Sequence, residues 1–206
     1  MFRDPVTSLE TLRAIVGGEP SEVARRKELP SLDAHARTFI ARSPFLLLGT
    51  SSADGRCDVS PKGDAPGFVR VLDDHCLVIP DRPGNKRLDG MRNILSNPHV
   101  GIIFLVPGND FTLRVNGRAT ITRDPELLHS LTAQGKTPVL AIGVEVEEVF
   151  LHCARSFRRG TLWDPATWPG AEALPSMPCI LYDQTGGAMS LEALEARNAQ
   201  SLASLY

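Results

Sequence analysis

The stretch from residue 56 to residue 93, RCDVSPKGDAPGFVRVLDDHCLVIPDRPGNKRLDGMRN, decides the fold of this 206-residue chain. It holds two strand-like runs, CDVSPKGD and FVRVLDDHCLVIP, and the second turns back on itself at Asp73-Asp74. A turn at Pro83-Gly84 follows, and a helix is predicted over 85–96. Strands that return on themselves within so few residues indicate an antiparallel sheet.

Residues suited to holding a phosphate lie on both sides of that turn. The strand period of two places Asp58, Ser60 and Lys62 on one face, and Lys86 and Arg87 open the predicted helix. A phosphate dianion favours cations and hydroxyl donors together, because charge-assisted hydrogen bonds are strong, and a helix start adds free N–H groups. The sequence therefore predicts an anion site if the fold joins the two segments. A solvated basic helix end beside a turn lysine is the alternative.

Strand-like runs flank this stretch on both sides. FLLLGTSS, from Phe45, turns at 53–55 (ADG) into the first strand above. VGIIFLVPG and FTLRVNGRATITRD form another hairpin around 108–110, and VLAIGVEVEEVFLHC is a further strand. Hairpins at short spacing, with helices inserted between them, predict a mainly β fold: an antiparallel barrel with peripheral helices.

Helices are predicted outside these strands. The run TSLE at 7–10 has the capping-box pattern with a hydroxyl at Thr7, and Gly17 stops the helix that follows. Ser31 is the expected cap of a second helix, LDAHARTFIARS, which Pro44 ends. We expect both helices to pack against the barrel or a partner subunit.

The second half of the chain has fewer signals. Asp124 and Pro125 start a helix that Gly135 ends. The stretch 158–187 is rich in Pro, Gly and Trp and is expected to form an ordered loop. Ser190 is the expected cap of a closing helix in SLEALEARNAQSLASLY.

The composition limits the possible partners and location. Lys+Arg 22 against Asp+Glu 24 gives a net charge of −2, which offers no general attraction to nucleic acid or an anionic membrane. No apolar run reaches the ~18 residues of a membrane span. The start, MFRDPVTSLETLR, lacks the apolar core of a signal peptide, and the four cysteines have no CxxC spacing. We therefore expect a cytoplasmic protein with reduced thiols.

Common catalytic motifs are missing from the sequence. GxGxxG, GxxxxGK[ST], GxSxG and HExxH do not occur. The pairs His75-Cys76 and His152-Cys153 lie in predicted strands, where consecutive side chains point to opposite faces. Neither pair can easily direct two ligands at one ion, so no metal site is expected.

Three segments, SPKGDAPGFV, LVIPDRPGNKRLDGMRNILSNPHVGIIFLVPG and TLRVNGRA, resemble in order and spacing those of the FMN-binding split β-barrel proteins related to pyridoxamine 5′-phosphate oxidase. The resemblance covers about residues 40–165. It implies an antiparallel split β-barrel with FMN at a homodimer interface. It further implies that Lys62 is the phosphate-binding strand lysine and that Lys86 and Arg87 are the basic pair. The remaining implied cofactor contacts are the strand backbone near Ser60, Ile79 and Pro80, then Thr112, and, from the partner subunit, Arg155, Arg158 and Trp163.

With this resemblance the chain divides into three parts. These are an N-terminal helical extension at 1–44, a split-barrel FMN-binding domain at 45–165, and a C-terminal loop and helix at 166–206 packing on the barrel. A cation near the flavin N1 would stabilise the reduced ring. Arg114 is a candidate for it, with an outward-facing strand arginine as the alternative.

The implied activity is that of an FMN-dependent oxidoreductase acting on a small organic substrate or NAD(P)H. The tail LPSMPCILYDQTGGAMS lacks the arginine/histidine cluster by which true pyridoxamine-phosphate oxidases bind their substrate, so vitamin B6 oxidation is doubtful. A non-catalytic flavin carrier or sensor is the main alternative, followed by a deazaflavin- or haem-binding relative and by an adaptor with a vacant pocket. The candidate haem ligands would be His75, His99, His129 and His152.

Overall fold

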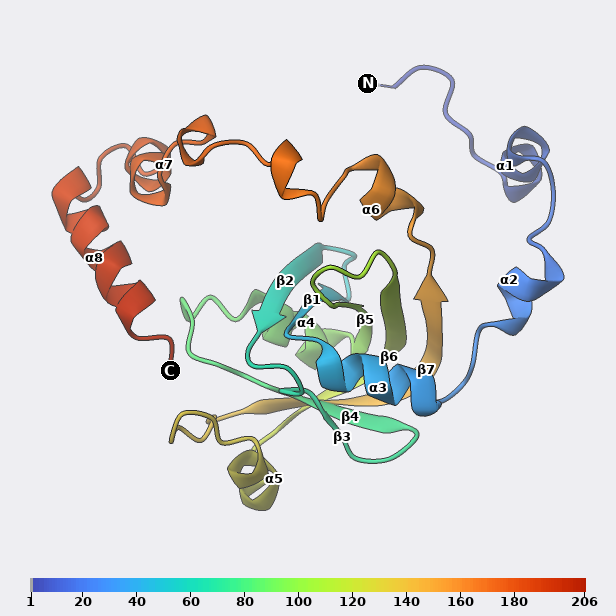
Figure 1. Ribbon diagram of the computed structural model, residues 1–206, viewed down its shortest axis with the longest axis horizontal. Helices are drawn as coiled ribbons and strands as arrows, with labels where there is room; N and C mark the ends of the chain where they lie inside the picture. The colour runs from blue at the N-terminus through green and yellow to red at the C-terminus, as the bar shows by residue number, and fades with distance from the viewer. Residues whose placement is uncertain (1) are drawn as a thin grey trace.

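The structure, a computed structural model, describes residues 2–206 (Figure 1). Within these residues one seven-stranded sheet has the order β2-β1-β5-β6-β7-β4-β3, and every neighbouring pair is antiparallel. The predicted mainly β, antiparallel barrel class is confirmed. The strands are β1 Phe45–Ser51, β2 Cys57–Gly63, β3 Arg70–Val71, β4 Cys76–Pro80, β5 His99–Leu105, β6 Thr112–Thr122 and β7 Ala141–His152.

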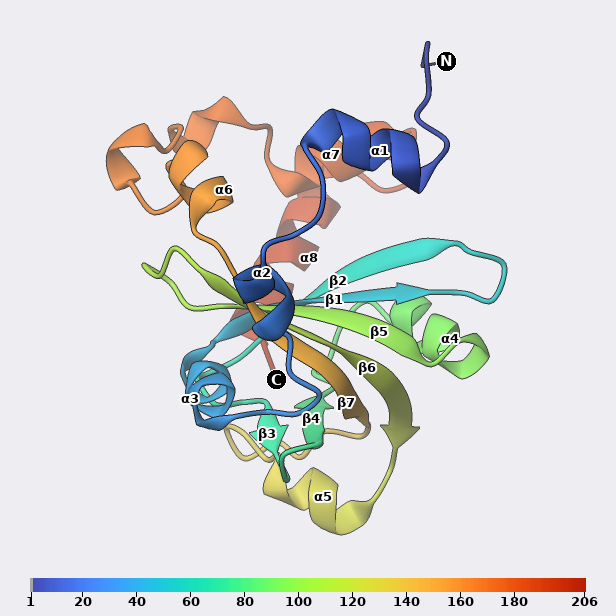
Figure 2. The ribbon, with the colours of Figure 1, turned by 90° about the vertical axis from the view of Figure 1, so that its right-hand side faces the viewer.

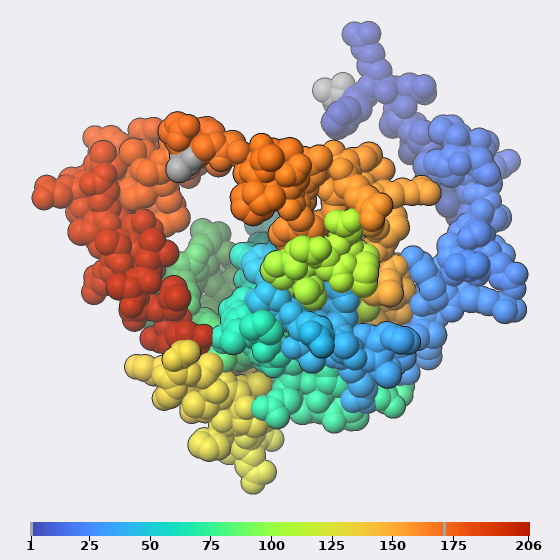
Figure 3. Space-filling model, in the orientation of Figure 1, coloured from blue at the N-terminus to red at the C-terminus, as the bar shows by residue number. Residues whose placement is uncertain are grey.

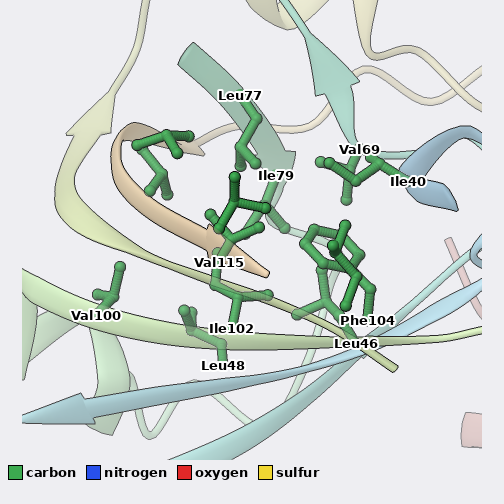
Figure 4. Close-up of a cluster of buried hydrophobic side chains, with 14 of the residues drawn as sticks. Ile40, Leu46, Leu48, Val69, Leu77, Ile79, Val100, Ile102, Phe104 and Val115 are labelled. Carbon is green, nitrogen blue, oxygen red and sulfur yellow. The ribbon is translucent and has the colours of Figure 1, made fainter. Parts of the chain in front are cut away.

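The core fills the inside of the curved sheet. Alternate residues of β1 and β5 point inward, and Leu48, Ile102 and Phe104 are at most 1% exposed. Figure 4 shows these side chains together with Leu77 and Ile79 from β4, across the barrel. Burial of each such side chain stabilises the fold by about 1.5–3 kcal/mol.

A β-bulge at Glu147, opposite Asn116 and Gly117, bends β7 against β6. A Cβ atom at Gly117 would lie 2.0 Å from the carbonyl oxygen of Glu145, so this close approach requires glycine. The curved sheet brings its edge strand β2 back toward the end of β4. Two ion pairs, Lys62–Asp81 and Asp64–Arg82, join the two segments.

Eight helices occur within residues 2–206, and they differ in how they contact the barrel. The amphipathic α3 and α4 bury apolar residues on it, among them Phe39, Ile40 and Ile94. The helices are α1 Leu9–Val16, α2 Glu22–Arg26, α3 Ala34–Arg42, α4 Asp89–Ser96, α5 Pro125–Ser130, α6 Arg155–Arg159, α7 Met177–Gln184 and α8 Leu191–Ala203, with short 3₁₀ turns η1 Pro165–Thr167 and η2 Ala171–Ala173. No helix of the described residues is both long and apolar enough to cross a membrane.

Two arms extend from the barrel in the two perpendicular ribbon views (Figures 1 and 2). The N-terminal arm carries α1 and α2, and neither helix buries a residue. The C-terminal arm carries α7 and α8 and returns to the barrel at its end, as the space-filling view also shows (Figure 3). There the hydroxyl of Tyr206 donates to Asp64.

The boundaries of α1, α3 and α5 differ from the predictions. The cap of α1 is Ser8, not Thr7, and the cap of α3 is Asp33, not Ser31. In both helices the true cap accepts the N–H three residues later, which fixes the boundary locally. The helix α5 ends at Ser130 and not at Gly135. Gly135 has a φ of +72° and lies in a separate tight turn after the helix.

Three further helices, α2, α6 and α7, were not predicted. The short basic helix α2 is capped by Ser21. The stretch 158–187, expected to be a loop, contains η1, η2 and α7, and Ser176 caps α7 with Pro178 in its first turn. The Ser-Met-Pro sequence is a helix-start signal that the proline content obscured. The closing helix capped by Ser190 is confirmed as α8.

The predicted helix over 85–96 begins later than expected. Lys86 and Leu88 have φ of +62° and +59°, left-handed values that a right-handed helix does not contain, so α4 begins at Asp89. Lys86 and Arg87 therefore do not open the helix but lie in the turn before it. The helical spacing of Leu88, Met91, Ile94 and Leu95 predicts one inner apolar stripe, but only Met91 and Ile94 are buried, whereas Leu88 and Leu95 are 51% and 78% exposed.

Candidate functional site

A cavity of about 700 Å³ opens between the edge strand β2, the segment 81–91 and the segment 136–142. Ser60 and Lys62 line it from β2, and Lys86 and Arg87 line it from the turn before α4. The two predicted half-sites, more than twenty residues apart in the chain, thus meet at one cavity. The curvature of the sheet is what joins them.

The β2 wall is built as its sequence indicates. β2 pairs only with β1, so its other edge is free, and Pro61 is tolerated there because no ladder bond is lost. Asp58, Ser60 and Lys62 are half-buried toward the cavity, while Val59 and Pro61 between them are exposed. The predicted alternation of faces is confirmed.

The turn wall is strained and ends at an uncapped helix. Left-handed φ values at non-glycine residues cost about 1–3 kcal/mol each, and Lys86 and Leu88 both have them. The side chain of Asn85 accepts the N–H of Arg87 at 3.0 Å, which holds the turn. Leu88 stands at the N-cap of α4 and has no side-chain acceptor for the first N–H groups. With Gly90 and Met91 also lining the cavity, this helix start favours an anion there.

Charges of both signs line the cavity. Lys62, Arg82, Lys86, Arg87 and Lys136 supply five cations against the three carboxylates of Asp58, Asp81 and Asp89. Arg87 donates to Asp89 at 2.7 Å, and Lys62 lies 3.7 Å from Asp81. Lys86 forms no ion pair with any residue of the range 2–206. An incoming phosphate would therefore meet a net positive wall.

A second ion pair at the rim was not predicted from the sequence. The Nε of Arg82 donates to Asp64 at 2.6 Å, and its Nη2 donates to the carbonyl of Leu131 at 3.1 Å. Tyr206 donates to the same carboxylate, and its ring lies 5.5 Å from the Arg82 guanidinium. No local pattern marks this cluster, because its members come from four distant segments.

The carboxylates of Asp64 and Asp81 have opposite pKa shifts. Burial alone would raise the pKa of Asp64, but hydrogen bonds from Tyr206, the Ala65 N–H and Arg82 outweigh it, so this pKa is lowered. Burial raises the pKa of Asp81, and the opposing attraction of Lys62 does not cancel it. Asp64 is thus held as an anion, whereas Asp81 is a carboxylate whose charge is less stabilised.

The other predicted site residues lie outside this cavity. Ile79 is fully buried in the core, and Pro80 pairs with Ala141 in the ladder between β4 and β7. The neighbouring Asp81 and Ile142 line the cavity, so the backbone at 79–80 runs beside it without forming its surface.

Five predicted residues gather instead near the hairpin that joins β5 and β6. Thr112 is buried opposite His152, and the Arg114 guanidinium lies 5.2 Å from the Phe150 ring centre. Arg158 donates to Asp110 at 2.8 Å, and the Trp163 Nε1 donates to the carbonyl of Asn109 at 2.9 Å. The fifth, Arg155, is exposed on α6. We call this group the hairpin cluster: Thr112, Arg114, Arg155, Arg158 and Trp163.

The histidines lie away from the cavity. His75, His99 and His129 are exposed, and His152 lies at the end of β7. None of them is among the described residues that line the cavity. Within the range 2–206 no group of three or more His, Cys, Asp or Glu side chains could hold a metal ion.

Comparison with known proteins places this chain in a family. The family model of pyridoxamine 5′-phosphate oxidase matches residues 32–153. No protein with a curated description matches the sequence.

Among solved structures, HupZ of Group A Streptococcus is 22% identical, with a TM-score of 0.47 over 58% of this chain and 93% of that chain. A candidate pyridoxamine 5′-phosphate oxidase from Lactobacillus delbrueckii is 25% identical, with a TM-score of 0.46 over 60% and 98%. An FMN-binding protein from Syntrophomonas wolfei is 12% identical, with a TM-score of 0.45 over 70% and 97%. Because the family model matches more than half of the sequence, and the antiparallel barrel agrees with it, the chain belongs to the pyridoxamine 5′-phosphate oxidase family, with its split-barrel fold.

Proposed function

We propose that this protein is a flavoprotein that binds FMN in the cavity between β2 and the segment 81–91. The observation that carries the proposal is the convergence of Ser60, Lys62, Lys86 and Arg87 on one cavity. Strand periodicity and donor chemistry in the sequence single out the same four residues. They supply the hydroxyl and cationic donors that a phosphate requires.

The shape and surface of the cavity suit this cofactor. Its volume of about 700 Å³ lies within the range of about 300–1,000 Å³ that is usual for small-molecule and cofactor sites. Leu48, Met91 and Ile142 add an apolar wall, as a flat, mostly apolar ring system requires. The phosphate would lie at Lys86, Arg87 and the start of α4, with Ser60 and Lys62 opposite.

A homodimer would complete the site. Ile142 at the cavity pairs with Ile121 on β6, nine residues beyond Thr112. At about 3.3 Å per residue, Thr112 lies some 30 Å along the strand from that point. The hairpin cluster contributes no residue to the described lining of its own subunit's cavity. In the proposed dimer it contacts the flavin of the partner subunit instead.

The proposed activity is that of an oxidoreductase. FMN, when bound, supplies hydride transfer between a small organic substrate or NAD(P)H and its ring. The chain binds the phosphate, orients the ring and tunes its charge. The guanidinium of Arg114, held beside Phe150, is the cation that would favour a negatively charged reduced ring in the partner subunit.

The absorption spectrum of the purified protein tests the proposal directly. We expect a yellow protein whose flavin absorbance is released on denaturation, or a colourless one that becomes yellow with added FMN. Protein that stays colourless after equilibration with FMN, and does not quench FMN fluorescence, would contradict the proposal.

A non-catalytic flavin carrier or sensor is the second candidate, because the cavity favours binding without marking an acid or base for catalysis. Bound flavin that neither NADH nor NADPH nor candidate organic donors reduce would favour it. A deazaflavin in place of FMN would bring its own absorbance and redox partners. A haem-binding relative is less supported, since the described cavity lining has no histidine. A Soret band in the absorption spectrum of the purified protein would favour haem binding.

A further inference from the structure

We propose that Asp81 is a specificity-determining residue of the cavity, because an anion that binds Lys62 must enter together with a proton taken up at Asp81. The inference rests on the proposed phosphate site and deepens it. On binding, the site takes up a phosphate ester together with one proton, and not the phosphate ester alone.

The position of Asp81 is fixed by the sheet. Its N–H donates to the carbonyl of Leu140 at 3.0 Å, directly after the last ladder pair of β4 and β7. Its side chain is 19% exposed and lies 3.7 Å from the Nζ of Lys62. Because the backbone is held, the carboxylate has little freedom to move away from an anion that approaches this lysine.

The carboxylate of Asp81 is also poorly satisfied. Asp64, two residues after Lys62, accepts hydrogen bonds from Arg82, Tyr206 and the Ala65 N–H. Asp81 has Lys62 as its one partner within residues 2–206, and the Nζ of Lys62 lies at the long distance of 3.7 Å. An acceptor-only group with a single distant donor, inside a cavity built for anions, is expected to bind a proton or to oppose the ligand.

The charges around Asp81 come from every wall of the cavity. β2 contributes Lys62 and, farther along, Asp58, and the segment 136–142 contributes Lys136. The turn contributes Lys86, Arg87 and Asp89, the last two paired with each other. Arg82 and Tyr206 are engaged by Asp64. Lys62 is thus the cation nearest to Asp81, and a phosphate bound there would neutralise its attraction.

The consequence is a proton linked to binding. Burial already raises the pKa of Asp81, and an anion on Lys62 raises it further by like-charge repulsion. The affinity for the anion should therefore rise as the pH falls through the pKa of Asp81 in the complex. Below the pKa of Asp81 in the free protein, a further fall in pH should not raise the affinity further, because Asp81 is then protonated before the anion binds. A protonated Asp81 also becomes an O–H donor to a ligand oxygen.

The test compares FMN affinity of the wild type and the Asp81→Asn variant from about pH 8 down to about pH 4, because a raised carboxyl pKa lies above the ordinary aspartate value of about 3.9. Asparagine imitates the protonated acid at every pH. The variant should bind FMN about tenfold more tightly at the upper pH, and the ratio should approach one at the lower pH. Protonation of the FMN phosphate affects both proteins alike and cancels in the ratio.

Calorimetry in two buffers of different ionisation enthalpy provides a second measurement. Near neutral pH the wild type should take up more protons per FMN bound than the variant does. Asp58→Asn is the matched control: it removes a carboxylate from the same strand face and cavity, but not the one that faces Lys62. It should leave the pH dependence of the wild type in place. Asp81→Ser, also neutral, should reproduce Asp81→Asn if the latter folds poorly.

The outcomes separate this inference from the proposed function. If FMN binds and Asp81→Asn and Asp81→Ser keep the wild-type affinity and proton uptake at every pH, the role of Asp81 is overturned while the flavoprotein stands. If FMN does not bind, inorganic pyrophosphate is the probe for the same comparison. A pH-dependent ratio with pyrophosphate supports the role of Asp81 without FMN, and no binding of either probe overturns both.

Discussion

Two ion pairs lie side by side where β2 meets the end of β4, and they differ in almost every property. Asp64–Arg82 is 2.6 Å long, with side chains 2% and 16% exposed, and Tyr206 adds a further hydrogen bond. Lys62–Asp81 is 3.7 Å long and has no further partner on its carboxylate within the described residues. The first is built to hold two parts of the barrel together. The second leaves the Lys62 ammonium and the Asp81 carboxylate able to interact with a ligand in the cavity.

The difference shows how a binding site can border a rigid joint. A fully hydrogen-bonded pair fixes the distance between β2 and the segment after β4. The adjacent, loosely satisfied pair can then exchange partners without opening the barrel. Variants of both pairs and of the adjacent turn test this division between a structural pair and a binding pair.

The largest effect should come from Arg82→Ala. Removing one partner of a buried pair leaves the other charge uncompensated, which costs about 3–5 kcal/mol of unfolding free energy. Urea denaturation of both proteins measures it. Arg87→Ala is the control, because its pair with Asp89 is 72% exposed on the arginine, and solvent screening leaves such a surface pair with little effect on stability. Equal losses in the two variants would contradict the division.

Lys62→Ala should affect binding instead of folding. Loss of one charged hydrogen bond to a phosphate should weaken FMN by about 1.5–3 kcal/mol, and Arg87→Ala should do the same. Fluorescence titration with FMN measures both. Riboflavin, which lacks the phosphate, should lose little affinity in either variant. Unchanged FMN affinity in both would remove the proposed phosphate site.

The two carboxylates should respond to acid with opposite signs. The pKa of Asp64 is lowered on folding, so its contribution to stability is present above its unfolded pKa of about 3.9 and is lost as the pH falls through its folded pKa. The pKa of Asp81 is raised, so its charge opposes folding above the folded pKa, and this penalty disappears as the pH falls through that value toward the unfolded one.

The corresponding variants provide the measurement. At neutral pH Asp64→Asn should lower the unfolding free energy, whereas Asp81→Asn should not lower it. The deficit of Asp64→Asn should shrink on acidification below about pH 4. Thermal unfolding of the wild type and both variants across this range measures the differences. A deficit of equal sign and pH dependence in the two variants would refute the assignment.

The smallest effect should come from Leu88→Gly in the strained turn. Glycine adopts left-handed φ without steric cost but loses more entropy on folding, so the net gain should be about 0.5 kcal/mol of unfolding free energy. Thermal unfolding detects it. Leu95→Gly, within the right-handed α4, should instead destabilise. A loss in both variants would show that the turn is not strained.

The sequence predicted the strands and one face of the site with good accuracy. Alternation on β2 placed Asp58, Ser60 and Lys62 on one side, and the Asp-Gly turn gave the β1–β2 hairpin. It failed at the turn before α4, where the positive φ at Lys86 delayed the helix. Nothing local distinguishes a left-handed lysine from a helical one, because the surrounding chain imposes that conformation.

The hairpin cluster shows a different limit. The family resemblance named Thr112, Arg155 and Trp163, and the structure shows that none of them reaches the cavity of its own subunit. Their assignment to a partner's flavin remains a prediction. Sequence reasoning missed Arg82, Asp64 and Tyr206, because a pair or hydrogen bond between residues 18 or 142 positions apart leaves no periodic signal.

The residue types that could hold a phosphate, and the face of β2 on which they lie, follow from the sequence alone, since strand periodicity and donor chemistry are local properties. That both half-sites share one cavity follows from the tertiary structure, because closure of the sheet depends on the bulge at Glu147, opposite Gly117, and on core packing. The tertiary structure also determines which of the two carboxylates at the cavity accepts hydrogen bonds. Asp64 and Asp81 are the same residue type, and only their surroundings make one a structural anchor and the other a candidate proton acceptor.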